Sequence, residues 1–292
     1  MSLSQKRSYL FAGLAILCWS SVSTAFKLGL MHLTPVGLLF TSAFVATLFL
    51  AISYALSPGS QEQGLIPNLY KSLPAGLLNP FLYYLVLFSA YSRLRAQEAQ
   101  ALNYTWAIVL TLLSALLLKQ RFRLKDLLAL LFSFAGVIVI STRGQVLKLH
   151  FDDAGGTLLA IGSSVIWALY WIINLKDARR DVSKLFFNFL VGFLLIAVYV
   201  ILSKSPLLLP EANILDALLY GVWVGIFEMG LTFVLWLQAL KLTQNTASIS
   251  NLIFITPFLS MLLIREVLGE PIHPATIIGL VMIVVSNLYQ KI

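Results

Sequence analysis

Long apolar segments separated by short polar stretches dominate the pattern of the chain. Ten such segments can be marked, at residues 9–31, 35–56, 73–91, 97–118, 126–141, 154–175, 184–203, 214–239, 246–264 and 274–289. Most approach the roughly 20 residues that an α-helix needs to cross the hydrocarbon core of a bilayer. They lack the period-2 alternation of transmembrane β-strands. The pattern therefore predicts an all-α membrane protein with ten transmembrane helices.

The distribution of basic residues predicts an orientation. If the N-terminus is cytoplasmic and the spans alternate, thirteen of the 20 Lys and Arg residues fall on the cytoplasmic side and seven on the other. Positive residues are enriched in cytoplasmic loops. We therefore expect both termini to be cytoplasmic in a multi-pass protein of the bacterial cytoplasmic (inner) membrane.

Composition narrows the class of protein. Hydrophobic residues make up 59% of the chain and charged residues 11%, which excludes an ordinary soluble enzyme or a disordered chain. The single cysteine, Cys18, forms no disulfide framework. The net charge of +8 is explained by the loops, so no nucleic-acid partner is expected. The chain has no Walker A or G-x-S-x-G motif, and we expect no enzyme activity, cofactor or metal.

The chain also repeats itself. A shift of 148 places Trp19 on Trp167, Arg93 on Lys241 and Asn103 on Asn251. This offset predicts two five-helix repeats, residues 1–145 and 146–292. Because five is odd, the second repeat must enter the membrane from the opposite side, which gives the inverted repeat common in secondary transporters.

The ends of the two halves and the segments near their fourth spans carry a family resemblance. These segments are LLLKQRFRLKDLLALLFSFAGVIVIS, LLIREVLGEPIHPATIIGLVMIVVS, AYSRLRAQEAQALNYTW and ALKLTQNTASISNLIFITPF. The sequence resembles the EamA type of the drug/metabolite transporter (DMT) superfamily. The resemblance implies a basket of ten helices, with spans 1–4 and 6–9 around a central cavity and spans 5 and 10 at the periphery. It also implies export or exchange of small metabolites.

A shorter motif resembles a subfamily. Asn103-Tyr104-Thr105-Trp106 is similar to the Asn-Tyr-x-Trp segment of the bacterial aromatic amino acid exporters called YddG, although Ala107 stands where that pattern has Pro. The resemblance implies an aromatic amino acid as the substrate.

Two charges lie well inside predicted spans, Lys27 and Glu228. A charge in the membrane is costly, by about 2.5–3.5 kcal/mol on insertion scales, and is a candidate for function. Lys27 can hold a substrate carboxylate or extend to the headgroups. Glu228 can hold a substrate ammonium, carry a coupling proton, or form a buried pair with Lys27. If both face one cavity, they match a zwitterion.

Aromatic and amide side chains complete the predicted site, because aromatic residues with polar tips line many small-molecule pockets. A single Trp or Tyr can instead belong to an interfacial belt, and Asn103 can hydrogen-bond between helices. The predicted cavity lining is Trp19, Lys27, Tyr83, Tyr84, Asn103, Trp106, Trp167, Trp171 and Glu228.

Helix packing and bending are predicted at four further positions. Gly221 and Gly225 form a G-x-x-x-G that predicts a close helix contact. Pro80 and Pro257 predict kinks, which can serve as hinges.

The predicted function is a secondary transporter that exports or exchanges small metabolites, amino acids above all, by alternating access around a midplane cavity. Its partners would be a small-molecule substrate and the lipid bilayer, and we assume a monomer. An exchanger of phosphorylated metabolites or nucleotide sugars is the alternative among carriers, and it would need more than one Lys or Arg in the cavity. A membrane-embedded enzyme or a channel would be a different class.

Overall fold

The computed structural model describes residues 3–57, 64–117, 124–146, 153–243, 249 and 252–291. Helices make up nearly all of these ranges, in which the isolated bridge between Leu33 and Leu208 is the only β-pairing. The helical segments are α1 (Leu3–Gly29), α2 (Pro35–Ala55), α3 (Leu65–Gly76), η1 (Leu77–Leu82), α4 (Tyr83–Arg93), α5 (Ala96–Asn103), α6 (Trp106–Leu117), α7 (Leu124–Ser141), α8 (Ala154–Lys176), α9 (Asp181–Ser203), α10 (Ile214–Val224), η2 (Gly225–Gly230), α11 (Leu231–Leu242), η3 (Leu252–Ile255), α13 (Thr256–Leu268) and α14 (Pro274–Lys291).

The described helices include seven that are long and apolar enough to cross a membrane. Three of these are composite, because Leu65–Arg93, Ala96–Leu117 and Ile214–Leu242 each join two or three helical segments. Two shorter apolar helices are also present, within α7 and α14. The all-helical membrane fold is thereby confirmed, whereas the count of ten spans stays a prediction.

Large apolar side chains remain exposed along the helices. Leu17, Ile52, Leu202 and Leu215 are each more than 60% exposed. Such residues would be costly in water but match the hydrocarbon around a membrane protein. The outer surface is therefore suited to lipid.

The interruptions of the helices repeat at the interval found in the sequence. Segments η1 and η2 are both π-helical, and a shift of 148 places Leu77–Leu82 on Gly225–Gly230. The break between α5 and α6, at Tyr104 and Thr105, coincides under the same shift with the start of η3. Asn251, the sequence partner of Asn103, lies outside the described residues. The shared offset supports two structurally similar halves.

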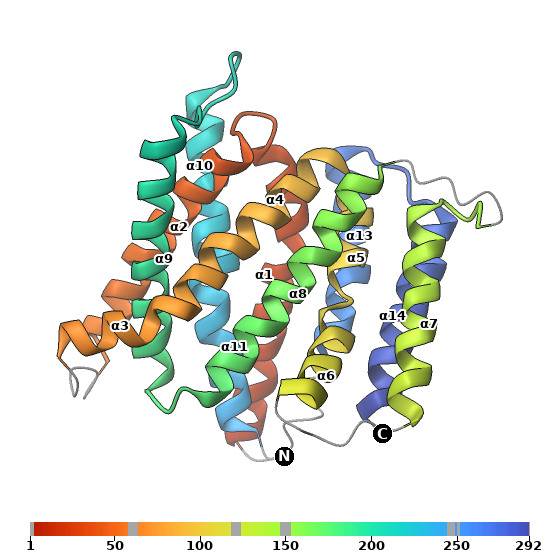
Figure 1. Cartoon of the computed structure of the whole chain (residues 1–292), viewed down its shortest axis with the longest axis horizontal. Helices are drawn as coiled ribbons and strands as arrows, with labels where there is room; N and C mark the ends of the chain where they lie inside the picture. The colour runs from red at the N-terminus through yellow and green to blue at the C-terminus, as the bar shows by residue number, and fades with distance from the viewer. Residues whose placement is uncertain are drawn as a thin grey trace.

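The first helices of the two halves run in opposite directions (Figure 1). Helix α1 runs away from the end of the molecule that carries the N and C labels, and α8 runs toward it. Helix α1 packs against α11 and α13 of the second half, while α8 packs against α4 and α6 of the first. Helices α7 and α14 pack together at one edge. The first helix of each half therefore packs against helices of the other half.

Local capping fixes where several helices begin. Thr34 accepts a hydrogen bond from the Gly37 backbone N–H, and Pro35 follows it at the first helical position of α2, as is typical of a helix start. Asp153 caps α8 through the Gly156 N–H at 2.8 Å. Hydrogen bonds from Arg93 and from this N–H lower the pKa of the Asp153 carboxyl below its ordinary value.

The close contact predicted for the G-x-x-x-G is confirmed. A Cβ added at Gly221 would lie 2.7 Å from the Thr41 hydroxyl, and one at Gly225 would lie 2.7 Å from the Ser42 carbonyl oxygen. Segment η2 thus approaches the backbone of α2, and α10 the Thr41 side chain, more closely than a larger residue would allow.

Pro80 and Pro257 lie in different structural settings. Pro80 lies inside η1, where the preceding Asn79 leaves the helical conformation (φ −144°, ψ 120°), so the predicted kink is confirmed. Pro257 instead lies in the first turn of α13, where its missing N–H leaves no helical hydrogen bond unmade. The kink predicted at Pro257 stays a prediction.

Candidate functional site

A cavity of about 510 Å³ lies between the two halves. Its walls come from α1, α4, α5 and α6 of the first half and from η2, α8, α11, η3, α13 and α14 of the second. The volume lies within the range of small-molecule sites. The polar and aromatic residues of its lining are Trp19, Ser23, Phe26, Tyr83, Tyr91, Gln100, Asn103, Tyr104, Trp106, Trp167, Trp171, Glu228, Phe233, Trp236, Phe254, Thr256 and Asn287.

Aromatic rings form a continuous wall across both halves of the molecule. Trp19 and Trp167, which the repeat relates to each other, both contact Phe233, with ring centroids 6.1 and 6.0 Å away. Trp236 continues the wall beyond Trp19 at 5.5 Å, and Tyr83 continues it beyond Trp167 at 4.7 Å. Rings in this arrangement offer a large apolar surface that loses little conformational freedom when a ligand stacks on it.

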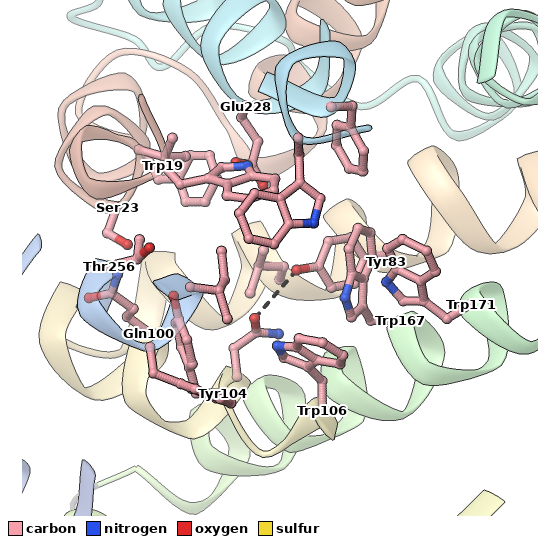
Figure 2. A pocket seen from close by; sticks show the side chains of 18 of the residues that line it. Trp19, Ser23, Tyr83, Gln100, Tyr104, Trp106, Trp167, Trp171, Glu228 and Thr256 are labelled. Atoms are coloured by element: carbon pink, nitrogen blue, oxygen red, sulfur yellow. Dashed lines mark hydrogen bonds between the residues drawn. The ribbon is translucent and has the colours of Figure 1, made fainter. Parts of the chain in front are cut away.

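Glu228 projects from η2 toward the same cavity, on the side where Trp19 lies (Figure 2). Its Oε1 atom accepts a hydrogen bond from the Tyr84 hydroxyl at 3.0 Å. Tyr84 itself is fully buried. A π-helical turn widens the helix by one residue and often marks a functional position, and here it carries the carboxylate.

Hydrogen bonds around the break between α5 and α6 hold the amide of Asn103. Its Nδ2 donates to the Ser163 hydroxyl at 2.8 Å, and its Oδ1 accepts from the Tyr83 hydroxyl at 3.4 Å, a bond drawn in Figure 2. Thr105 donates to the Leu102 carbonyl at 2.8 Å and bonds the Ser164 hydroxyl at 3.0 Å. The break is therefore tied to α8, and irregular backbone at membrane depth is expected where it borders a cavity.

Lys27 does not belong to the cavity lining. Its ammonium donates to the backbone carbonyls of Tyr91 and Leu94, at 2.8 and 2.6 Å. These carbonyls lie at the C-terminal end of α4, where unpaired carbonyls and the helix dipole favour a cation. Of the alternatives for Glu228, a pair with Lys27 is not formed, because Lys27 donates to these two carbonyls and Glu228 accepts from Tyr84.

The other predicted residues are placed as follows. Tyr84 lies behind the wall and reaches the cavity only through its bond to Glu228. Seven of the nine predicted residues line the cavity, namely Trp19, Tyr83, Asn103, Trp106, Trp167, Trp171 and Glu228.

Sequence reasoning left several lining residues out of the predicted set. Phe233 occupies the centre of the aromatic wall but carries no polar group that would mark it in the sequence. Trp236 lies on the helical stripe that also holds Glu228 and Thr232, and this spacing was a usable signal. Tyr104 is the second residue of the Asn-Tyr-x-Trp motif.

Charge in the lining is limited. Among the described residues that form it, Glu228 is the only carboxylate, and none is Lys, Arg or His. The searched part of the chain also contains no group of three or more His, Cys, Asp or Glu side chains that could hold a metal ion.

Direct hydrogen bonds join the two halves at the end opposite the termini (Figure 1). The Glu270 carboxylate accepts from the Ala96 N–H at 3.1 and 3.2 Å. Gln97 donates to the Pro271 carbonyl at 2.8 Å and accepts from the His273 N–H at 3.2 Å. The start of α5 is thus bound to the loop between α13 and α14, which belongs to the other half.

Comparisons with known proteins agree with the repeat. The sequence profile of the EamA-like transporter family matches the chain twice, at residues 6–142 and 154–289. An uncharacterized transporter of Clostridium kluyveri is 24% identical over 198 residues, covering 66% of this chain and 63% of that protein. The uncharacterized transporter YyaM of Bacillus subtilis is 25% identical over 190 residues, covering 62% and 59%. The chain therefore spans less than two thirds of the length of these relatives.

One solved crystal structure is similar along almost the whole chain. It has a TM-score of 0.65 and 24% sequence identity, and the match covers 97% of this chain and 96% of that chain. This likeness establishes a shared fold.

Proposed function

Because the chain belongs to the EamA-like transporter family, part of the DMT superfamily, we propose that it carries small metabolites across the membrane by alternating access. The substrate is of amino-acid size and has an aromatic part. The membrane is the bacterial cytoplasmic membrane, with both termini on the cytoplasmic side.

The observation that carries this proposal is the cavity shared by the two halves. Side chains of both halves contribute to one wall, where Phe233 contacts Trp19 on one side and Trp167 on the other. If the halves rock against each other, a ligand on this wall meets both of them throughout the cycle. Transporters with inverted repeats bind their substrates at such an interface.

The hydrogen bonds of Gln97 and Glu270 support a state of the transport cycle in which the cavity is closed at the end opposite the termini. They join the first turn of α5 to the loop that precedes α14, and each is a contact that can separate without unfolding a helix. The cavity lining meanwhile extends along α6 and α11 to Leu110 and Leu240, toward the end that carries the termini. A state closed on one side is what alternating access requires.

The nature of the wall favours an aromatic substrate. Six Trp and Tyr residues surround the cavity along α1, α4, α6 and α8, namely Trp19, Tyr83, Tyr91, Trp106, Trp167 and Trp171. The Asn-Tyr-x-Trp segment, which resembles that of the aromatic amino acid exporters called YddG, lies at the helix break beside the cavity. An exchanger of phosphorylated metabolites receives less support, because the described lining has no Lys or Arg for a phosphate.

Counterflow in proteoliposomes tests the proposal. Purified protein is reconstituted with a high internal concentration of an unlabelled aromatic amine or amino acid, and uptake of trace labelled ligand is followed. A carrier gives transient accumulation above equilibrium that depends on the internal ligand. Equal flux with and without internal ligand would indicate a pore, and no flux with any ligand of this class would reject the proposal.

A further inference from the structure

We infer that the cavity selects an organic cation, an ammonium attached to an aromatic body, in preference to a zwitterionic amino acid. The inference rests on the proposed function, because it names the class of substrate bound in the same cavity.

The first step is the charge of the lining. Glu228 is the only carboxylate among the described lining residues, and none of the described residues of the wall is Lys, Arg or His. Its Oε1 accepts from Tyr84 at 3.0 Å, whereas Oε2 accepts no hydrogen bond within the described part of the chain. A carboxylate with one unused oxygen beside a cavity is suited to an ammonium, which offers three donors.

The second step concerns the opposite charge. A cation is the strongest partner for the carboxylate of an amino acid, and Lys27 is the basic residue of α1 nearest to this depth. Its ammonium is held by the Tyr91 and Leu94 carbonyls at 2.8 and 2.6 Å. An amino acid bound by its ammonium at Glu228 would therefore bring its own carboxylate close to a like charge without compensation.

The neutral donors of the lining carry no charge that would balance a carboxylate beside Glu228. The Asn103 amide donates to Ser163, and the Asn287 amide donates to the Tyr104 carbonyl at 3.4 Å. The indole N–H of Trp171 is buried without a hydrogen-bond partner in the described part of the chain, and it is likewise uncharged. None of these groups balances the charge of a carboxylate next to Glu228.

The third step is the aromatic wall itself. The face of an indole attracts cations, and Trp is the strongest of the aromatic residues in this respect. Trp19 and Trp236 lie 5.5 Å apart by their ring centroids, and Figure 2 shows Trp19 beside Glu228. The carboxylate and the indole faces thus favour the same sign of charge, while Trp167, Tyr83 and Phe233 offer surface for an aromatic body.

A matched ligand series tests this selectivity. Isothermal titration of the purified full chain at neutral pH would compare phenethylamine, phenylalanine, 3-phenylpropionate and 2-phenylethanol, which share one ring and differ in charge. We expect phenethylamine to bind on the order of tenfold tighter than phenylalanine or more, a difference of about 1.4 kcal/mol, and 3-phenylpropionate to bind weakest. Phenylalanine binding as tightly as phenethylamine, or no binding of phenethylamine, overturns the inference.

Two variants locate the selectivity. Glu228→Gln should lower the affinity for phenethylamine to that of 2-phenylethanol, whereas Glu266→Gln, the same change at a side chain that is 76% exposed, should leave the series unchanged. A cation preference that survives in folded Glu228→Gln also overturns the inference. Because the series on the unaltered chain already decides the sign of the preference, the test does not depend on the folding of a variant.

The outcome is separable from that of the proposed function. If phenylalanine binds more tightly and drives counterflow, the transporter stands and the cation selectivity fails. If phenethylamine binds as expected but no ligand gives counterflow, the selectivity stands and the transport function fails.

Discussion

Glu228 has one hydrogen bond to the described protein, from the hydroxyl of the fully buried Tyr84. A hydrogen bond to a charged group contributes about 1.5–3 kcal/mol, so this bond is a substantial link between η2 and α4. We expect Tyr84→Phe to lower the thermal unfolding temperature in detergent. In the Glu228→Gln background the same change should cost less, because the bond no longer involves a charge. Equal costs in both backgrounds would show that the two residues are not coupled.

Lys27 gives a second prediction for a single residue. Because its ammonium serves the last carbonyls of α4, Lys27→Met should destabilise the protein by about 1–3 kcal/mol without changing the order of ligand affinities. Lys27→Arg should recover part of the lost stability, since it keeps a donor and the charge. Thermal unfolding and ligand titration on the same samples separate the two effects. If Lys27→Met kept normal stability but no longer distinguished ligands with a carboxylate from those without one, Lys27 would have to be part of the binding site.

The contrast between Lys27 and Glu228 shows what sequence reasoning can reach for single residues. Both are charges within apolar segments, and the cost of burying them marks each as important. Helical spacing placed Trp19 and Trp167 on interior faces, and both line the cavity. Spacing on one helix cannot reveal where a neighbouring helix ends. The carbonyls that hold Lys27 belong to α4, and only the tertiary arrangement brings them within 2.8 Å.

Among the elements, the long apolar spans follow from hydropathy, but their interruptions do not. The pattern predicted continuous helices over residues 97–118 and 214–239, whereas the structure divides them at Tyr104 and at η2. The mean hydropathy of a segment is almost unaffected by one extra residue in a turn. The signals that mark interruptions are local, such as Pro80 for η1 and the glycines that bound η2, and such signals also occur in regular helices.

The contact between η2 and α2 gives a prediction for a helix pair. A Cβ at Gly225 would lie 2.7 Å from both the Ser42 carbonyl oxygen and the Val45 Cβ, whereas a Cβ at Gly13 would have no neighbour within 4 Å. Gly225→Ala should therefore destabilise by about 1–3 kcal/mol through overpacking. Gly13→Ala should be neutral or stabilising by up to about 1 kcal/mol, because Ala favours the helix.

Thermal unfolding of these two variants, measured side by side, checks that contact. The substitution is the same in both and each glycine lies in a helical segment, so the difference in unfolding temperature reports the tertiary contact. Gly225→Ala with an unchanged unfolding temperature would mean that α2 and η2 can move apart at no cost.

For the molecule as a whole, the repeat was accessible from the sequence because its offset recurs in both residue identity and hydropathy. The structure adds that the interruptions obey the same offset of 148, at η1 and η2. The sequence could not supply the pairing between halves, in which α1 packs on α11 while α8 packs on α4. Those contacts join residues more than 60 positions apart, and they create the wall around Phe233.

The hydrogen bonds between the halves at the end opposite the termini lead to a prediction about the whole molecule. Gln97 is 1% exposed and makes two hydrogen bonds across the halves, each contributing about 1 kcal/mol. Gln97→Leu should therefore shift the population toward a state open at this end, by on the order of tenfold. The shift can be read by labelling Gln100→Cys, a cavity position, in a Cys18→Ser background with a membrane-impermeant maleimide.

Labelling from the face opposite the termini should be slow in the parent and on the order of tenfold faster with Gln97→Leu. Arg265→Gln serves as the control, because its side chain is 64% exposed at the same end and should leave the rate unchanged. Labelling from the termini side should slow as the other rate rises, since one cavity cannot be open to both sides in alternating access. Simultaneous acceleration from both faces would instead describe a leak, and the two halves would then act as walls of a pore.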